Sequence, residues 1–208
     1  MLAGWRWDVA LLQEVPPWWT ADLAAACAAR GAAVLTSRNS ALPLRHALAE
    51  RWPDAIKSNG GGANVILLRD TSERLRSSHV RLRVWPERRV AQAVWLPDGS
   101  VAVNYHGSAR VPLATQELER LWGWAVGLAG GAPVVLGGDL NLREPAAPPG
   151  AVHAARRDVD HIFAAGYEVA GAAGPLARTL DLGGREVELS DHPPLLAQLV
   201  RSAVSAGE

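Results

Sequence analysis

Short apolar runs that end in polar residues recur along this chain. One run covers residues 8–14 and is stopped by Pro16 and Pro17, and another covers residues 133–138 and is followed by Asp139. Apolar runs of about four to eight residues bounded by turn formers are typical of buried strands. The pattern therefore predicts strands that deliver polar side chains to one edge of a sheet.

The middle of the chain is rich in β-branched residues. It predicts consecutive antiparallel strands over residues 64–69, 79–85, 90–96 and 101–106, with a hairpin turn at residues 97–100. Later strands are expected over residues 159–163 and 194–200. The sequence contains no repeat of fixed period and no linker between two domains.

Three helices are predicted between these strands. Thr20 caps a helix that runs through an alanine-rich stretch to Gly31, a second helix covers residues 42–52, and a third covers 111–128. In the third helix, the apolar side chains with helical spacing are Leu113, Leu118, Leu121, Trp122 and Ala125. Its polar residues Glu117, Glu119 and Arg120 are expected to face solvent.

Composition and charge favour one soluble domain over residues 1–208. No segment approaches the roughly 20 apolar residues that span a membrane. Lys+Arg and Asp+Glu both number 21, so the zero net charge gives no long-range attraction to nucleic acid, although a local basic groove is compatible with it. The single cysteine, Cys27, excludes an intrachain disulfide and favours a cytoplasmic protein. We expect a monomer without stable membrane insertion.

The polar residues at the predicted strand ends are of the types that metal-phosphate chemistry uses. They are Gln13, Glu14, His106, Asp139, Asn141, Asp160, Asp191 and His192. A hard divalent cation such as Mg²⁺ prefers carboxylate and amide oxygens, and one cysteine gives no basis for a structural zinc site. Each motif alone also fits a surface turn, but the ordered set favours a functional site.

Five of these motifs together resemble the ordered signatures of the endonuclease/exonuclease/phosphatase family. They are Leu-Leu-Gln-Glu at 11–14, Asn-Tyr-His at 104–106, Gly-Asp-Leu-Asn at 138–141, Asp-Val-Asp-His-Ile-Phe at 158–163 and Ser-Asp-His at 190–192. The resemblance implies an α/β fold of two packed, mixed, largely antiparallel β-sheets flanked by helices. This arrangement is a four-layer α/β/β/α sandwich.

The resemblance also implies a metal site. Glu14 would bind Mg²⁺ or Mn²⁺, Gln13 would support that ligand, and Asp191 would lie beside the metal or the attacking water. The cation would act as a Lewis acid and as a template for the substrate.

The remaining motif residues would act on the substrate if the resemblance holds. Asp139 would orient or deprotonate the attacking water, and Asn141 would hold a phosphate oxygen. His106 and His192 would bind the phosphate and stabilise developing charge, while Asp160 would orient His192.

One family feature is missing from the sequence. Family members begin with a strand that ends in an asparagine of the active site, and no such strand precedes Gln13 and Glu14. We therefore expect either an N-terminally incomplete domain or a version of the fold that lacks this central strand. Loss of a central strand would expose backbone groups, so poor stability or weak activity is expected of these residues alone.

The sequence thus favours a metal-dependent phosphoesterase that uses an activated water on a phosphodiester or phosphomonoester. Nucleic acid is one candidate substrate, which would make the protein an endonuclease or exonuclease. A non-catalytic binding module that retains the fold is an alternative, supported by the missing asparagine and opposed by the intact later motifs. A sphingomyelinase-like phospholipid hydrolase is another, for which Trp18 and Trp19 would contact a membrane surface.

Overall fold

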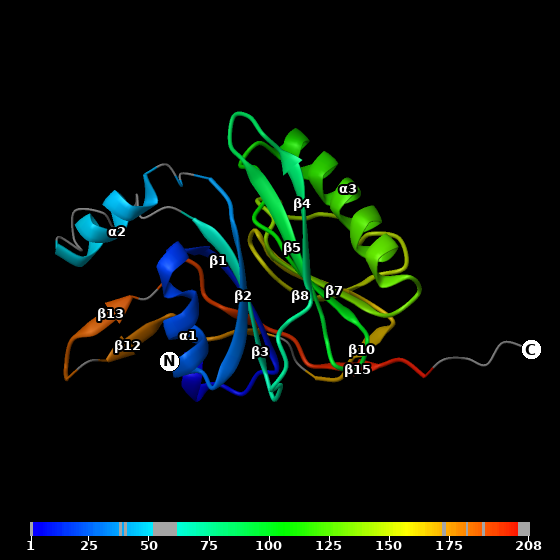
Figure 1. Ribbon diagram of the computed structural model, residues 1–208. Helices are drawn as coiled ribbons and strands as arrows, with labels where there is room; N and C mark the ends of the chain where they lie inside the picture. Colours follow the sequence, from blue (N-terminus) through cyan, green and yellow to red (C-terminus); the bar gives the residue numbers. More distant parts are fainter. Residues whose placement is uncertain are drawn as a thin grey trace, which may run out of the picture.

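Two β-sheets pack face to face at the centre of the molecule, and helices cover their outer faces (Figure 1). The computed structural model describes residues 2–37, 39, 41–51, 62–171, 174–181, 183–188 and 190–203. Ile66 from one sheet and Val94 and Ala102 from the other share a buried cluster between the sheets. Burial of this apolar surface holds the two layers together.

The smaller sheet has three strands in the order β1 (Val9–Val15), β3 (Ala63–Arg69) and β2 (Ala29–Leu35), and both outer strands run antiparallel to β3. This half of the molecule also contains two short 3-10 turns, η1 (Leu2–Gly4) and η2 (Pro17–Trp19), and two helices, α1 (Thr20–Ala26) and α2 (Leu42–Arg51) (Figure 1). Figure 1 shows α1 on the outer side of this sheet.

The larger sheet has six strands. Their order is β4 (Ser77–Arg83), β5 (Arg89–Trp95), β6 (Val101–Asn104), β7 (Val134–Asp139), β9 (Asp160–Ala165) and β8 (Val152–Arg157). Only β6 and β7 pair in parallel, and α3 (Val111–Ala129) connects them across the outer face. A parallel pair needs such a crossover, and it brings the carboxyl ends of β6 and β7 to the same edge.

Three short antiparallel pairs follow the larger sheet. They join β10 (Tyr167–Val169) to β15 (Leu199–Arg201), β11 (Gly174–Pro175) to β14 (Leu195–Leu196), and β12 (Thr179–Asp181) to β13 (Glu186–Glu188). Residues 190–193 lie between β13 and β14. These pairs therefore fix both flanks of the segment that carries the last predicted motif.

The four-layer α/β/β/α sandwich implied by the resemblance is confirmed, whereas several predicted elements are wrong. The helix through the alanines ends at Ala26, and β2 begins at Ala29 because this segment pairs with β3 along its whole length. Thr20 does not cap α1; Trp19 is the cap residue, and the Thr20 hydroxyl is buried without a partner among the described residues.

The first of the four consecutive strands predicted in the middle of the chain lies in the other sheet. β3 pairs with β1 and β2, whereas only β4, β5 and β6 form an antiparallel series. Strand β8 was not predicted. Trp52, the expected end of the second helix, lies outside the described residues. Among the helices in the described part of the chain, none is long and apolar enough to cross a membrane.

Candidate active site

An irregularity at the end of β1 separates the side chains of Gln13 and Glu14. The pairing with β3 shifts between Leu12 and Val15, and Glu14 has a φ of 55°. Bulges of this kind re-aim side chains at strand ends. The Glu14 side chain is 56% exposed, and its Oε1 lies 4.0 Å from Nδ1 of His106.

Gln13 instead joins a buried amide network between the sheets. Its Nε2 donates to Oδ1 of Asn104 at 2.6 Å. Asn104 is fully buried, and its Nδ2 donates to the carbonyl oxygens of Leu12 at 2.8 Å and Val65 at 3.0 Å. Buried amides must be hydrogen-bonded in this way to avoid a desolvation penalty. The network ties β6 to β1 and β3 directly beneath the site.

His106 and Asp139 meet where β6 and β7 end side by side. Nε2 of His106 lies 3.7 Å from Oδ2 of Asp139. The other oxygen of Asp139 accepts the backbone N–H of Asn141 at 2.9 Å, and Nδ2 of Asn141 donates to the carbonyl of Gly107 at 3.0 Å. The two loops that follow the parallel strands are thus joined to each other.

Burial keeps the imidazole of His106 neutral. Desolvation lowers its pKa, and the positive charge of Arg89 lowers it further, although the carboxylates of Asp139 and Glu14 act in the opposite direction. A neutral imidazole can donate one hydrogen bond to a phosphate oxygen without carrying a charge of its own.

Asp160 and His192 form the second pair of the site. Nδ1 of His192 lies 2.9 Å from Oδ2 of Asp160. Asp160 begins β9 and is the backbone partner of Asp139 on β7, so the two carboxylates come from adjacent strands. Ligand-type atoms of Asp139, Asp160 and His192 all lie within 4.8 Å of one another.

The pKa of each group in the second pair is shifted upward. Burial raises the pKa of Asp160 to about 6, and the charge of Asp139 adds to this rise, while His192 opposes it. Burial lowers the pKa of His192, but the carboxylates of Asp160, Asp139 and Asp191 outweigh it and the pKa is raised. The two groups titrate as a coupled unit, in which the carboxylate of Asp160 favours the protonated form of His192.

The structure brings most of the predicted site residues to one edge of the sandwich. Asp191 lines a pocket of about 170 Å³ together with Asp160 and His192, and its backbone carbonyl accepts a hydrogen bond from Arg178 at 2.7 Å. Glu14 and Asp191, the residues expected to contact the metal, are not part of the three-residue group of Asp139, Asp160 and His192.

Two buried residues near the site were not predicted. His161 is 1% exposed, and its Nε2 donates to the carbonyl oxygen of Leu142 at 2.6 Å, directly after the Asp139–Asn141 loop. The alternation of β9 places His161 on the face opposite Asp160, and this spacing was the available signal. Glu117 is fully buried on α3 and was expected to face solvent.

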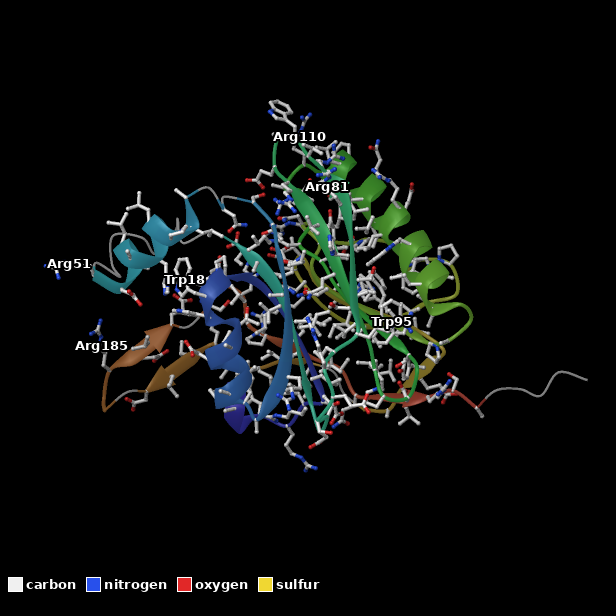
Figure 2. All side chains as sticks on the ribbon, viewed as in Figure 1. Trp18, Arg51, Arg81, Trp95, Arg110 and Arg185 are labelled. Carbon is white, nitrogen blue, oxygen red and sulfur yellow. The ribbon has the colours of Figure 1, made fainter. Side chains whose placement is uncertain are left out.

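The two tryptophans after Glu14 lie in different environments. The ring of Trp18 stacks on His46 of α2 with centroids 4.8 Å apart, and Figure 2 shows it between α1 and α2. Trp19 is 51% exposed. Trp18 therefore packs within the protein, and only Trp19 presents a large apolar surface to solvent.

The sequence match to a known family agrees with this geometry. A sequence model described as the Endonuclease/Exonuclease/phosphatase family matches residues 1–192. The chain belongs to the endonuclease/exonuclease/phosphatase family. Members of this family are generally hydrolytic phosphoesterases that depend on divalent metals. A search of curated protein sequences returns no match.

Several solved structures share the fold. A family protein from Bacteroides thetaiotaomicron is 16% identical, with a TM-score of 0.66 over 95% of this chain and 84% of that chain. A conserved protein of unknown function from Enterococcus faecalis V583 is 17% identical, with a TM-score of 0.64 over 94% and 86%. The human nocturnin catalytic domain with bound sulfate is 16% identical, with a TM-score of 0.55 over 94% and 81%.

The donor set at this edge fits a hard divalent cation of the kind that endonuclease/exonuclease/phosphatase proteins use. Glu14 offers a carboxylate that is open to solvent, and such a position leaves room for the waters that Mg²⁺ retains. His192 is a weaker candidate ligand because Asp160 raises its pKa and so favours the protonated form, whereas metals bind the neutral imidazole. The Glu14 end of the site is therefore better suited to a cation than the Asp160–His192 end.

Proposed function

We propose that this protein is a divalent-metal-dependent phosphoesterase that hydrolyses a phosphodiester or phosphomonoester with an activated water. One observation carries the proposal: Asp139 lies between His106 and the Asp160–His192 pair at a single sheet edge. A carboxylate flanked by two imidazoles provides an acceptor for a water proton and two donors for phosphate oxygens.

Asp139 is suited to orient the attacking water. Its Oδ1 is held by the N–H of Asn141, so the carboxylate is fixed in one orientation. Its Oδ2 faces the site and can accept a hydrogen bond from water. A fixed acceptor lowers the entropic barrier because the nucleophile is positioned before reaction.

The two histidines are suited to stabilise different charges. Asp160 fixes His192 through Nδ1 and raises its pKa, which favours the protonated form, in which Nε2–H can donate to a phosphate oxygen or to the leaving oxygen. His106 is neutral and donates without adding charge. Donors fixed before the transition state stabilise the developing negative charge more effectively than mobile ones. We assign Asn141 to the phosphate as well, through a side chain anchored beside Gly107.

Glu14 is the proposed metal ligand, with Gln13 supporting its strand end through Asn104 and with Asp191 near the metal or water. When bound, Mg²⁺ or Mn²⁺ would supply Lewis acidity and neutralise charge on the substrate phosphate. The oxygen-rich donors favour these hard cations over zinc.

We propose a phosphodiester, including nucleic acid, as the first substrate class to test. The sulfate in the nocturnin structure is a tetrahedral oxyanion, as is phosphate, and is compatible with an oxyanion site in this fold. The balanced charge of 21 cations and 21 anions favours a single strand or a small diester over non-specific duplex binding. A cytoplasmic location, favoured by the single Cys27, is part of this proposal.

The test is metal-dependent hydrolysis of a bis-aryl phosphodiester, an aryl phosphomonoester, single-stranded DNA and duplex DNA. The wild-type protein is compared with His192→Ala and with His79→Ala, a histidine on the exposed edge strand β4. We expect His192→Ala to reduce the rate at least about 100-fold and His79→Ala to retain it. Equal rates in all three proteins would show that the activity does not use this site.

A further inference from the structure

Glu117 on α3 is a fully buried carboxylate that the proposed reaction does not use. It is 0% exposed, although a charged residue on a surface helix ordinarily faces solvent. A buried charge is strongly unfavourable unless it is paired and hydrogen-bonded. The partners of Glu117 therefore indicate why a charge is placed there.

These partners come from the segment that carries His106. Oε2 of Glu117 accepts the Tyr105 hydroxyl at 2.8 Å and the backbone N–H of Ser108 at 3.0 Å. Oε1 accepts the Ser108 hydroxyl at 2.7 Å and the Nε of Arg83 from β4. Burial works against ionisation, but the bonds from Arg83, Ser108 and Tyr105 hold the pKa of Glu117 below its usual value.

His106 is thus held from two sides. On the α3 side, Glu117 binds the residue before His106 and the residue two positions after it. On the other side, the N–H of Gly107 donates to the carbonyl of Asp139 at 2.8 Å, and its own carbonyl accepts the Asn141 amide. The imidazole itself is 14% exposed, and its Nε2 lies 3.7 Å from Oδ2 of Asp139.

Docking of α3 does not require this carboxylate. The same face of the helix buries Ala114, Leu118, Leu121, Trp122 and Ala125 against the larger sheet. Figure 1 shows the helix lying along the outer face of that sheet. Replacing buried ion pairs by apolar residues of similar volume is often neutral or stabilising, so packing alone does not explain Glu117.

We propose that Glu117 is a positioning residue for His106: its carboxylate fixes Tyr105 and Ser108, and so sets where the imidazole meets the substrate phosphate. The inference rests on the proposed phosphoesterase function, in which His106 binds that phosphate. Arg83 balances the charge of Glu117 and connects β4 to the same network.

The test compares Glu117→Gln, Tyr105→Phe and Ser108→Ala with Leu121→Ala. The first three remove a charge or a single hydroxyl from the network. The control removes apolar volume from the same helix face, at a fully buried position whose side chain forms none of the hydrogen bonds of this network. Melting temperature, kcat and KM on a bis-aryl phosphodiester are measured below the onset of unfolding of every variant.

A positioning role predicts that Glu117→Gln lowers kcat about 10- to 100-fold with a smaller change in KM. Leu121→Ala should keep kcat within about threefold despite an equal or larger loss of melting temperature. In a His106→Ala background, Glu117→Gln should have no further effect on kcat, because its effect passes through that imidazole. Additive effects of the two substitutions, or equal kcat losses in Leu121→Ala, would overturn the proposal.

Two further measurements test the Glu117 network even if one variant does not fold or the wild-type protein shows no activity. If Glu117→Gln does not fold, Tyr105→Phe and Ser108→Ala still test the network, with smaller losses of kcat expected. Hydrogen exchange provides a readout without activity: the Ser108 amide should exchange slowly in the wild type and faster in these variants, while β9 is unchanged. A wild-type protein without phosphoesterase activity refutes the proposed function, and unchanged Ser108 exchange refutes the network itself.

Discussion

Gly107, the residue after His106, has no room for a side chain. A Cβ at this position would lie 2.5 Å from the carbonyl oxygen of Leu140, a backbone atom that cannot rotate away. Real Cβ atoms essentially never approach a heavy atom closer than 3.0 Å, so Gly107→Ala must separate the two loops by at least about 0.5 Å. We expect overpacking of this kind to destabilise the protein by about 1–3 kcal/mol.

The same displacement should also lower the catalytic rate. Gly107 bonds to Asp139 and Asn141, so moving the loops apart disturbs the 3.7 Å approach of His106 to Asp139. A misplacement of about 1 Å can reduce a rate about 100-fold, and half that distance implies a loss of about 10-fold in kcat. The melting temperature should fall by about 2–12 °C.

The assay pairs Gly107→Ala with Gly127→Ala. Gly127 lies within α3, and a Cβ there meets nothing within 4 Å. Replacing a helical glycine by alanine should stabilise the protein by about 0.4–1 kcal/mol without changing kcat. Thermal unfolding and steady-state hydrolysis are measured on all three proteins. Wild-type kcat and stability in Gly107→Ala would refute the close approach of the two loops.

Three further outcomes follow from the buried groups and the open end of the site. The pH profile of kcat/KM should be bell-shaped, with an acid limb near pH 6, where Asp160 takes up a proton. Asp160→Asn should move the basic limb to lower pH, because it removes the carboxylate that raises the pKa of His192. Asn104→Ala should lower the free energy of unfolding in urea by about 2–4 kcal/mol, because it removes the hydrogen bond to Gln13 and leaves two buried carbonyl oxygens without their donor. A change under about 0.5 kcal/mol would contradict the network. Chelation with EDTA should abolish hydrolysis, and Mg²⁺ or Mn²⁺ should restore it and raise the melting temperature. Glu14→Ala should remove this rise in melting temperature. A rise that persists in Glu14→Ala would place the cation elsewhere.

Motifs at strand ends were predictable because they depend on local rules. Apolar runs such as residues 133–138 specify a buried strand, and parallel strands bring their carboxyl ends to one edge. The order of the motifs along the chain then predicted that His106, Asp139 and Asp160 lie together. The bond between His192 and Asp160 agrees with the orienting role that the resemblance implied.

Other features depend on contacts that the sequence does not display. The alanine-rich stretch has high helix propensity throughout, and only pairing with β3 turns residues 29–35 into a strand. Glu117 is a different case, because it stands four residues after Leu113 and four before Leu121, on the apolar stripe of α3. Its charge was taken to indicate exposure, whereas its spacing indicated burial.

The most direct test of the account is the effect of Asp139→Asn on metal-dependent hydrolysis of a phosphodiester. The amide keeps an oxygen for the Asn141 N–H and removes only the negative charge that would accept a proton from water. We predict a rate at least about 100-fold lower than that of the wild type, in a protein whose melting temperature is nearly unchanged. A folded Asp139→Asn protein that hydrolyses the diester at the wild-type rate would contradict the proposed chemistry of this site.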